Sequence, residues 1–511
     1  MSRSPRKIAM ALTAVAASLT LAACSAGAAS TSTSSSSSTD AETPTEVTIG
    51  FGAEPASLDF TTTDGAAIPQ ALLDNVYEGL VTMDDNGDIQ PLLAESWEVS
   101  DDNLTYTFTL ASDVAFSNGD AFTAETVKWN IENVQSDNWT ISLKSYMDVV
   151  DSVEVIDDTT VAVTLSSPSN DWLFRMTTRV GAMFDPDAVD DLATTAVGTG
   201  PYVVSSFNLG DSLVLEKNDG YWGDEPEMDT VTFKYIEDAN AMNSALLSGS
   251  IDAIPGFASL DTLDQFSDES EYQILEGGTS AEMVLSLNNA SGIFTDVTAR
   301  QAVNYAIDRQ TIIDSVAGGY GQLIGSMVPT TDPWFDESLV DAYPYDPEKA
   351  KELIAEAGIE GETIRFQVPS NSDTQQVAQL VASNLEQVGL NVEIEILEFP
   401  AQWLEQVFTG HDFDMSVINH VEARDLATYA NPDYYWGYDS EEFQELIAAA
   451  DAGTAEEQVE YLTEAAALLS EEAVSDWLYL QANITIAVTG LEGLPMNSTS
   501  ESFNVTDLSW S

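Results

Sequence analysis

Apolar and polar residues alternate at every second position in four short stretches of this chain. The stretches lie at residues 47–51, 106–110, 161–165 and 231–235. Because successive side chains of a strand point to opposite faces, a period of two indicates strands with one buried face. Asn-Gly pairs at 86–87 and 118–119 favour the positive φ values of tight hairpin turns. The first of these regions therefore predicts a strand-rich body containing a meander of about 110 residues.

Further along the chain the apolar period changes to that of a helix. Asp346 is typical of an N-cap, Pro347 of the first helical position and Gly358 of a helix end. A second helical pattern runs from Val377 to Val388, and the strand pattern of residues 392–396 follows directly. This order of helix, short loop and strand predicts an α/β lobe.

The first 45 residues have a different character. Three bases and a short apolar run precede Leu21-Ala22-Ala23-Cys24, which holds the only cysteine of the 511-residue chain. The apolar run is shorter than the ~20 residues of a spanning helix, so residues 1–23 are expected to be a secretory signal peptide. Residues 24–45 are rich in Ser, Thr, Ala and Gly and are expected to be a disordered linker.

The charge of the chain is strongly negative. It has 86 acidic and 15 basic residues and a formal net charge of −71. Such a surface repels nucleic acid and anionic lipid and favours a soluble monomer. With carboxylates this dense, two acids close together in sequence say almost nothing about acid/base catalysis.

Signatures of catalysis are scarce. The chain has no Gly-x-Ser-x-Gly elbow, no phosphate-binding loop and no His-Glu-x-x-His sequence. Its only histidines are His411, expected in a polar turn, and His420, which follows a strand and is a candidate for a cleft wall. We therefore expect no enzyme activity, no cofactor and no metal site. A hydrolase would need a nucleophile with an activating base, and an adhesin would need repeats or extended β modules. The sequence shows neither feature, so neither class is favoured.

Several sequence segments, in order, resemble extracytoplasmic solute-binding proteins of family 5, the peptide, dipeptide and nickel group of ABC importers. They include the following stretches: Glu54-Pro55-Ala56-Ser57-Leu58-Asp59, Asn75-Val76-Tyr77-Glu78-Gly79-Leu80, Pro91-Leu92-Leu93-Ala94-Glu95-Ser96-Trp97, Phe116-Ser117-Asn118-Gly119-Asp120, Gly198-Thr199-Gly200-Pro201-Tyr202, Asn218-Asp219-Gly220-Tyr221-Trp222 and Ala299-Arg300-Gln301-Ala302. The N-terminal Leu-Ala-Ala-Cys resembles a lipobox, which implies that Cys24 carries a lipid anchor.

The resemblance implies an α/β fold of the type II periplasmic-binding-protein class, with two lobes, hinge strands and an inserted subdomain. Lobe I would be discontinuous and consist of residues 46–80, 191–283 and 482–511. Residues 81–190 would form the inserted subdomain and 284–481 lobe II. The hinge strands are expected near Glu282 to Leu287 and Tyr479 to Ile484.

The resemblance also implies where a ligand binds. An aspartate of lobe II would pair with the amine of a peptide; Asp425 is the first candidate and Glu422 the second. Arg424 could meet a carboxylate or a surface acid, and both alternatives stay open. The remaining cleft candidates are His420, Asn419, Phe257, Gly256, Pro69, Gln70, Glu282, Met283, Tyr435 and Trp436.

The expected function is capture of short peptides by a lipid-anchored receptor on the extracytoplasmic face of the bacterial cell membrane. Its partners would be ABC permease subunits with cytoplasmic ATPases. The alternative is the same scaffold binding an oligosaccharide or another small solute, because Trp403, Tyr434, Tyr435 and Trp436 could stack against sugar rings.

Overall fold

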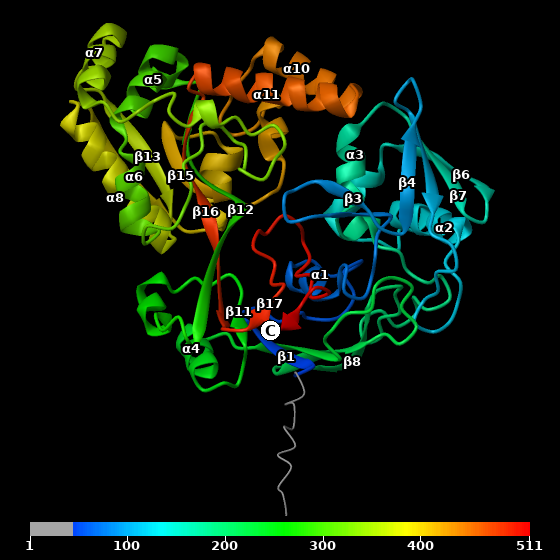
Figure 1. Cartoon of the computed structure of the whole chain (residues 1–511). Coiled ribbons are helices and arrows are strands. Elements are labelled where there is room, and N and C mark those ends of the chain that lie inside the picture. The colour runs from blue at the N-terminus through cyan, green and yellow to red at the C-terminus, as the bar shows by residue number, and fades with distance from the viewer. Residues whose placement is uncertain (1–43) are drawn as a thin grey trace, which may run out of the picture. The chain divides into compact units, whose positions relative to one another are not determined.

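The structure, a computed structural model, describes residues 44–511 (Figure 1). The expected signal peptide, Cys24 and all but the last two residues of the expected linker lie outside the described residues. Within residues 44–511, no helix combines the length and the apolar character needed to cross a membrane.

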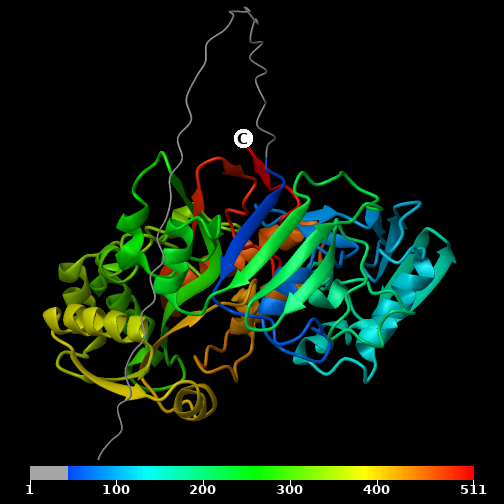
Figure 2. The same ribbon diagram turned by 90° about the horizontal axis from the view of Figure 1, so that it is seen from below.

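The largest sheet of the described chain has ten strands. Its order is β14-β13-β15-β12-β16-β11-β1-β10-β9-β8. In Figure 2, β1 lies among the green strands that follow it much later in sequence. The strand bounds, in the order of the sheet, are Asn391–Leu397, Thr363–Pro369, Met415–His420, Tyr272–Leu287, Ser475–Val488, Ala253–Ile254, Glu46–Phe51, Thr230–Tyr235, Ser212–Lys217 and Tyr202–Asn208.

Two long neighbouring strands, β12 and β16, join the two halves of this sheet. The last part of β12 pairs with β15, whereas its first part pairs only with β16, which in turn pairs with β11. The β12–β16 ladder loses its register between Gly278 and Glu282 and again between Met283 and Val284. Both strands predicted as hinges therefore cross between the halves, and the larger irregularity lies just before Glu282. We call residues 284–481 the second lobe.

Residues 81–190, which we call the inserted subdomain, form a separate layer. A sheet of order β4-β5-β7-β6 packs against α2, and the hairpin β2–β3 precedes it. Gly87 turns this hairpin with φ +82°, as the Asn-Gly pair predicts. The bounds are β2 Val81–Met83, β3 Ile89–Pro91, β4 Ala94–Val99, β5 Thr105–Leu110, β6 Val150–Asp157, β7 Thr160–Leu165, α2 Ala124–Gln135 and α3 Asn170–Arg175.

Helices surround the second-lobe part of the sheet, with two separate apolar cores. One core packs against α5, α6, α7 and α8, and the other is aromatic and packs against α10 and α11. Asp346 caps α7 by accepting a hydrogen bond from the Lys349 amide, and Gly358 ends it at φ +69°. The bounds are α5 Val297–Ala306, α6 Arg309–Val316, α7 Pro347–Ala357, α8 Ser372–Gln387, α9 Ala401–Trp403, α10 Glu441–Ala452 and α11 Ala455–Glu471.

The remaining α-helices are α1 and α4, and the remaining strands are β17 and β18. Helix α1 (Ala67–Leu72) is tied to the C-terminal segment, because the Phe503 amide donates to the Gln70 carbonyl. Helix α4 (Ala239–Leu247) packs against β11. The short strands β17 (Leu491–Glu492) and β18 (Ser509–Trp510) pair with each other.

Candidate functional site

A cavity of about 400 Å³ lies between the second lobe, the inserted subdomain and the C-terminal segment. We call it the cleft cavity. Its second-lobe wall is the chain just after β15, residues 421–423, and Ser280 of the hinge lines it as well. The opposite wall consists of Leu143, Tyr146, Phe174, Arg175, Thr177, Thr178, Arg179, Ser498, Thr499, Ser500 and Glu501. The volume falls in the range of about 300–1,000 Å³ that is usual for small-molecule sites.

Charged groups of both signs line the cleft cavity. Glu422 is exposed, whereas Arg179 is buried and paired with Glu501. The Arg175 guanidinium lies 4.2 Å from the Tyr146 ring, and its Nε donates to Asp171 at 2.8 Å. Among the described residues, neither Nη nitrogen of Arg175 has a hydrogen-bond acceptor. The cavity therefore has a free carboxylate on one wall and free guanidinium donors on the other.

The second lobe touches the inserted subdomain directly through Arg424. Its guanidinium lies 4.2 Å from the Phe174 ring of the subdomain and 4.9 Å from the Trp334 ring of the second lobe. It also donates to the Gly87 carbonyl at 3.4 Å. Arg424 has φ +59°, which is unusual for a residue with a side chain. It lines a separate cavity of about 220 Å³ and not the cleft cavity.

A second set of contacts between these parts, which we call the clasp, joins residues 169–171 to residues 450–453. The Asn170 amide donates to the carbonyls of Ala450 at 2.9 Å and Gly453 at 2.8 Å. One carboxylate oxygen of Asp451 accepts from the Ser169 hydroxyl and from the Asp171 amide. The clasp thus holds the end of α10 against the start of α3, two elements that lie side by side in Figure 1.

Behind the cavity wall lies an acid cluster formed by Glu282, Asp332 and Asp425. Glu282 is fully buried and Asp425 is 6% exposed. Within residues 44–511, both carboxylate oxygens of Glu282 and both of Asp425 lack a hydrogen-bond partner. Oδ2 of Asp332 lacks one as well. Burial, followed by the charges of neighbouring acids, raises the pKa of Glu282 and of Asp425 well above the usual range. Burial raises the pKa of Asp332 to about 6, although Arg424 opposes this effect.

His420 lies beside the acid cluster and is held on one side only. Its Nε2 shares a hydrogen bond with the Tyr435 hydroxyl at 2.9 Å, and that hydroxyl contacts the Ser286 hydroxyl at 2.6 Å. Its Nδ1 lies 3.7 Å from Oδ2 of Asp425. Burial lowers the pKa of His420 to about 4, so the ring is neutral near pH 7 and this contact is not an ion pair.

The structure separates the predicted hinge residues onto two faces of the sheet. Glu282 pairs with His420 across β12 and β15, and Met283 pairs with Asn419. Met283 packs into the core beside α5 and α8, whereas the acid cluster lies on the aromatic side. Because neighbouring strand residues point to opposite faces, Met283 and Asn419 lie on the other face from Glu282 and His420. All four residues were expected at one cleft.

The first-lobe candidates also lie away from the cleft cavity. Gly256 and Phe257 line a different cavity of about 400 Å³ on the Met283 side of the hinge strands. Tyr320 and Tyr479 of the second lobe also line it, so both candidates do border a space between the lobes. Pro69 is buried in α1 and Gln70 is half-buried there. No described cavity is lined by either residue of α1. The N-terminal end of α1 still borders the site, because Arg179 donates to the Gly65 carbonyl at 3.0 Å.

The aromatic candidates belong to the core. Tyr435 and Trp436 are both fully buried, and Trp403 is 3% exposed. The Tyr429 and Trp436 rings stack at 3.9 Å between centroids. These aromatic rings support His420 and the strand β15 from behind. The expected ligand platform at Tyr435 and Trp436 is therefore not formed at the cavity surface, because the interior of the second lobe encloses both rings.

Some residues of the cavity were missed by sequence reasoning. Tyr146, Arg175 and residues 498–501 line it, but the first two lie in the inserted subdomain and the last near the C-terminus. The chain has only 15 Lys and Arg residues. This scarcity of basic residues could have marked Arg175 as a candidate for the site.

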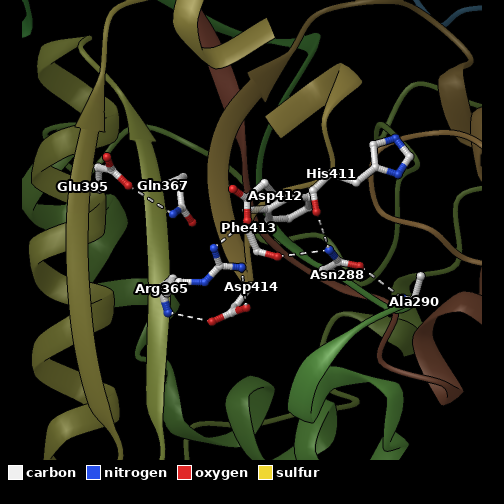
Figure 3. Close-up of polar contacts among 9 residues, drawn as sticks. All are labelled: Asn288, Ala290, Arg365, Gln367, Glu395, His411, Asp412, Phe413 and Asp414. Atoms are coloured by element: carbon white, nitrogen blue, oxygen red, sulfur yellow. Dashed lines mark hydrogen bonds and ion pairs between the residues drawn. The ribbon is translucent and has the colours of Figure 1, made fainter. Parts of the chain in front are cut away.

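The other histidine lies apart from this site. Figure 3 shows Arg365 directed toward Asp412 and Asp414, with the His411 ring pointing away from them. Arg365 joins Asp412 at 2.6 Å and Asp414 at 3.1 Å. His411 has φ +49°, which agrees with its predicted place in a turn.

A larger hollow of about 520 Å³ lies elsewhere on the second lobe. Tyr305 of α5, Lys349 of α7 and Glu471 of α11 line it. No residue of the inserted subdomain or of the hinge strands borders it, so it is not a space between the lobes.

Comparison with known proteins decides the family. The sequence model described as "Bacterial extracellular solute-binding proteins, family 5 Middle" matches residues 88–442. The chain belongs to this family. The glutathione-binding protein GsiB of Salmonella paratyphi A is 29% identical over 363 residues, covering 69% of this chain and 70% of that protein. The nickel-binding periplasmic protein of Escherichia coli is 29% identical over 346 residues, 62% of this chain and 65% of that protein.

The fold of this family 5 protein is that of solved binding proteins. HbpA2 from Haemophilus parasuis has a TM-score of 0.82 at 21% identity, covering 91% of this chain and all of that chain. The type II periplasmic-binding-protein fold expected from sequence is therefore confirmed. As a family 5 member the protein is a substrate-binding protein of an ABC importer and acts outside the cytoplasm.

Proposed function

We propose that this family 5 protein captures short peptides in the cleft cavity and delivers them to a permease driven by cytoplasmic ATPases. The observation that carries the proposal is the charge of the two cavity walls, with Glu422 on one and Arg175 on the other. A short peptide carries an ammonium group at one end and a carboxylate at the other. Such a ligand complements both walls at once.

The amine end is assigned to Glu422. Its side chain is exposed and lines the cavity, whereas Asp425 is 6% exposed and lies behind the wall. An ammonium ion in the cavity can therefore contact Glu422 without any rearrangement. The sequence ranked Asp425 first, and the difference in exposure reverses that order. Asp425, buried behind the wall, makes no direct contact with the amine in this assignment.

The carboxylate end is assigned to Arg175. Its Nε is engaged with Asp171, which leaves the two Nη nitrogens in a fork suited to a bidentate carboxylate contact. The Tyr146 ring beneath the guanidinium fixes its position. Hydroxyl groups of Ser498 and Ser500 line the same side and can donate further hydrogen bonds. The Thr499 hydroxyl already donates to the Asp84 carbonyl at 2.9 Å.

Closure of the lobes follows from the same arrangement. A ligand that spans the cavity contacts the second lobe and the inserted subdomain together, so it binds the closed form better than the open one. Such a ligand shifts the population toward the closed form. The permease would then recognise the closed form.

Two of the observations bear on the ligand class. GsiB is named for glutathione, which is itself a short peptide, and this supports a peptide ligand. An oligosaccharide is less well supported because Trp403, Tyr435 and Trp436 are buried and cannot stack against a sugar in the cavity. Attachment to the membrane through a lipid on Cys24 is part of the proposal and rests on the sequence alone.

Native mass spectrometry tests this function. The purified protein, stripped of ligand, is offered a pool of dipeptides, tripeptides and oligosaccharides, and we expect retained masses that match peptides. Replacing Glu422 by Gln should weaken binding of a retained peptide about tenfold, since about 1.4 kcal/mol corresponds to that factor. Calorimetry measures the change.

The matched control is Glu360→Gln, which removes the same charge from an exposed position that lines no described cavity. We expect its affinity to equal that of the unmodified chain. Retention of sugars alone would overturn the peptide proposal. An unchanged affinity in Glu422→Gln would remove Glu422 from the amine site.

A further inference from the structure

We propose that His420, Glu422 and Asp425 bind one divalent transition-metal cation in the wall of the cleft cavity. Each residue offers one ligand atom, and these atoms all lie within 4.8 Å of one another. Two ligands of a tetrahedral metal with bonds of about 2.1 Å lie about 3.4 Å apart. Nδ1 of His420 and Oδ2 of Asp425 are already 3.7 Å apart, so small side-chain movements complete the site.

The burial of the acids is the second observation. Asp425 is 6% exposed, and among the described residues neither of its carboxylate oxygens has a hydrogen-bond partner. Glu282 is fully buried with both oxygens unpartnered, and it lies close enough to Asp425 for the charge of Asp425 to act on it. Unpaired buried carboxylates are costly. A cation among these groups supplies the missing partner.

The histidine is already oriented for metal binding. Its Nε2 bonds to the Tyr435 hydroxyl, which is held in turn by Ser286. Metal-bound histidines commonly use their second ring nitrogen in this way, and the bond fixes both ring position and tautomer. In the tautomer in which Nε2 donates to that hydroxyl, the lone pair is on Nδ1, the nitrogen that faces Asp425.

The donor set selects the class of metal. One imidazole nitrogen with two carboxylates suits Zn²⁺, Ni²⁺ and similar ions, whereas Ca²⁺ and Mg²⁺ prefer oxygen ligands alone. Two carboxylates and a neutral imidazole carry a charge of −2, which a divalent cation balances. Glu422 lines the cavity, so an open coordination position would face the ligand space.

This inference does not rest on peptide capture. Glu422 belongs to both proposed sites, so a bound cation and a ligand ammonium group would compete for its carboxylate. The cation is therefore tested alone, without any peptide. A failure of the peptide proposal would leave that titration unaffected.

The test is titration of the full chain, freed of metal by chelation, with Zn²⁺ and with Ni²⁺ in a buffer of moderate salt. We expect one tight equivalent above the weak binding of surface acids, and no displacement by excess Ca²⁺. The chain has only two histidines. NMR of selectively labelled histidine should therefore show one ring shifted by the metal and one unchanged.

His420→Gln should weaken the tight equivalent at least tenfold, while His411→Asn should leave it unchanged. His411 is a fitting control because it has φ +49°, a conformation that asparagine adopts readily. Glu422→Gln should also weaken the metal at least tenfold, and because Glu422 is exposed this variant keeps the fold even if the buried one does not. Absence of a tight equivalent would overturn the site, and so would an affinity in His420→Gln or Glu422→Gln that equals that of the unmodified chain.

Discussion

At the scale of single residues, the buried carboxylate of Glu78 shows how this protein accommodates an acid without a basic partner. Glu78 is 1% exposed and accepts hydrogen bonds from the Tyr221 hydroxyl and from Nε1 of Trp222, each at 2.9 Å. Burial is the largest effect on its pKa, which rises from the ordinary 4.5 to about 7 despite these donors. A chain with so few bases leaves such acids to hold a proton in the folded state.

This raised pKa predicts how stability changes with pH. The folded protein binds the Glu78 proton more tightly than the unfolded chain, so the contribution is fully present below pH 4.5 and is lost as pH rises through 7. The difference corresponds to about 3 kcal/mol. Denaturant unfolding at several pH values should show that Glu78→Gln loses less stability between pH 5 and pH 8 than the unmodified chain.

Glu360→Gln is the control for this experiment, because an exposed acid of the same charge should leave the pH slope unchanged. Asp74 and Asp476, whose pKa values burial raises to about 6, add to the slope in the same direction in every variant. Equal slopes in Glu78→Gln and the unmodified chain would contradict the assignment.

The segment from 419 to 425 shows where sequence reasoning reaches its limit at this scale. Its place beside the site was predicted, and Glu422 indeed lines the cavity. Which side chains turn inward depends on the end of β15 and on the positive φ of Arg424. Neither feature has a local sequence signal, so Asp425 was ranked above Glu422. Alternation along β15 could have separated Asn419 from His420.

At the scale of elements, we expect the clasp between α3 and α10 to favour the closed form proposed above. Asn170→Ala removes two hydrogen bonds to the end of α10 without touching a residue that lines the cleft cavity. At about 1 kcal/mol for each bond, the variant should bind ligand about five- to thirtyfold more weakly. Calorimetry with any retained ligand measures the affinity, and small-angle scattering should show a more open ligand-free form.

Asn138→Ala is the control for the clasp. It removes an amide of the same subdomain whose side chain, among residues 44–511, hydrogen-bonds only to Asn133. We expect no change in affinity or in scattering. Should Asn170→Ala bind as tightly as Asn138→Ala, the clasp would have no role in closure.

Local elements were largely predictable, because their signals are local. The alternation at residues 47–51 and 231–235 became β1 and β10, and Asp346 and Gly358 limit α7 as expected. The joining of ten strands into one sheet was not predictable by these rules. It depends on pairings such as Ile49 with Phe233, which no short window of sequence contains.

At the scale of the whole molecule, the net charge of −71 dominates. Many acids have no basic partner within reach, so the folded state carries strong repulsion between its own charges. Salt screens this repulsion, with a Debye length of about 10 Å at 0.1 M. Raising NaCl from 20 mM to 0.5 M should therefore increase the melting temperature.

Calorimetric scans in NaCl and in KCl measure this effect, and we expect the same increase in both, since screening depends on ionic strength and not on the ion. A melting temperature that falls with salt would show that the few ion pairs, such as Arg179 with Glu501, outweigh the repulsion.

The paired strands β12 and β16 have one more consequence for the importer. They are the two places where the described chain passes between the second lobe and the rest of the body, and they are bonded to each other along most of their length. Two bonded neighbours cannot swing independently, so the lobes can change their relation only by twisting and bending this one ribbon where its register is interrupted. A ligand that closes the lobes must therefore deform this one ribbon, and the deformation would be the signal available to a permease.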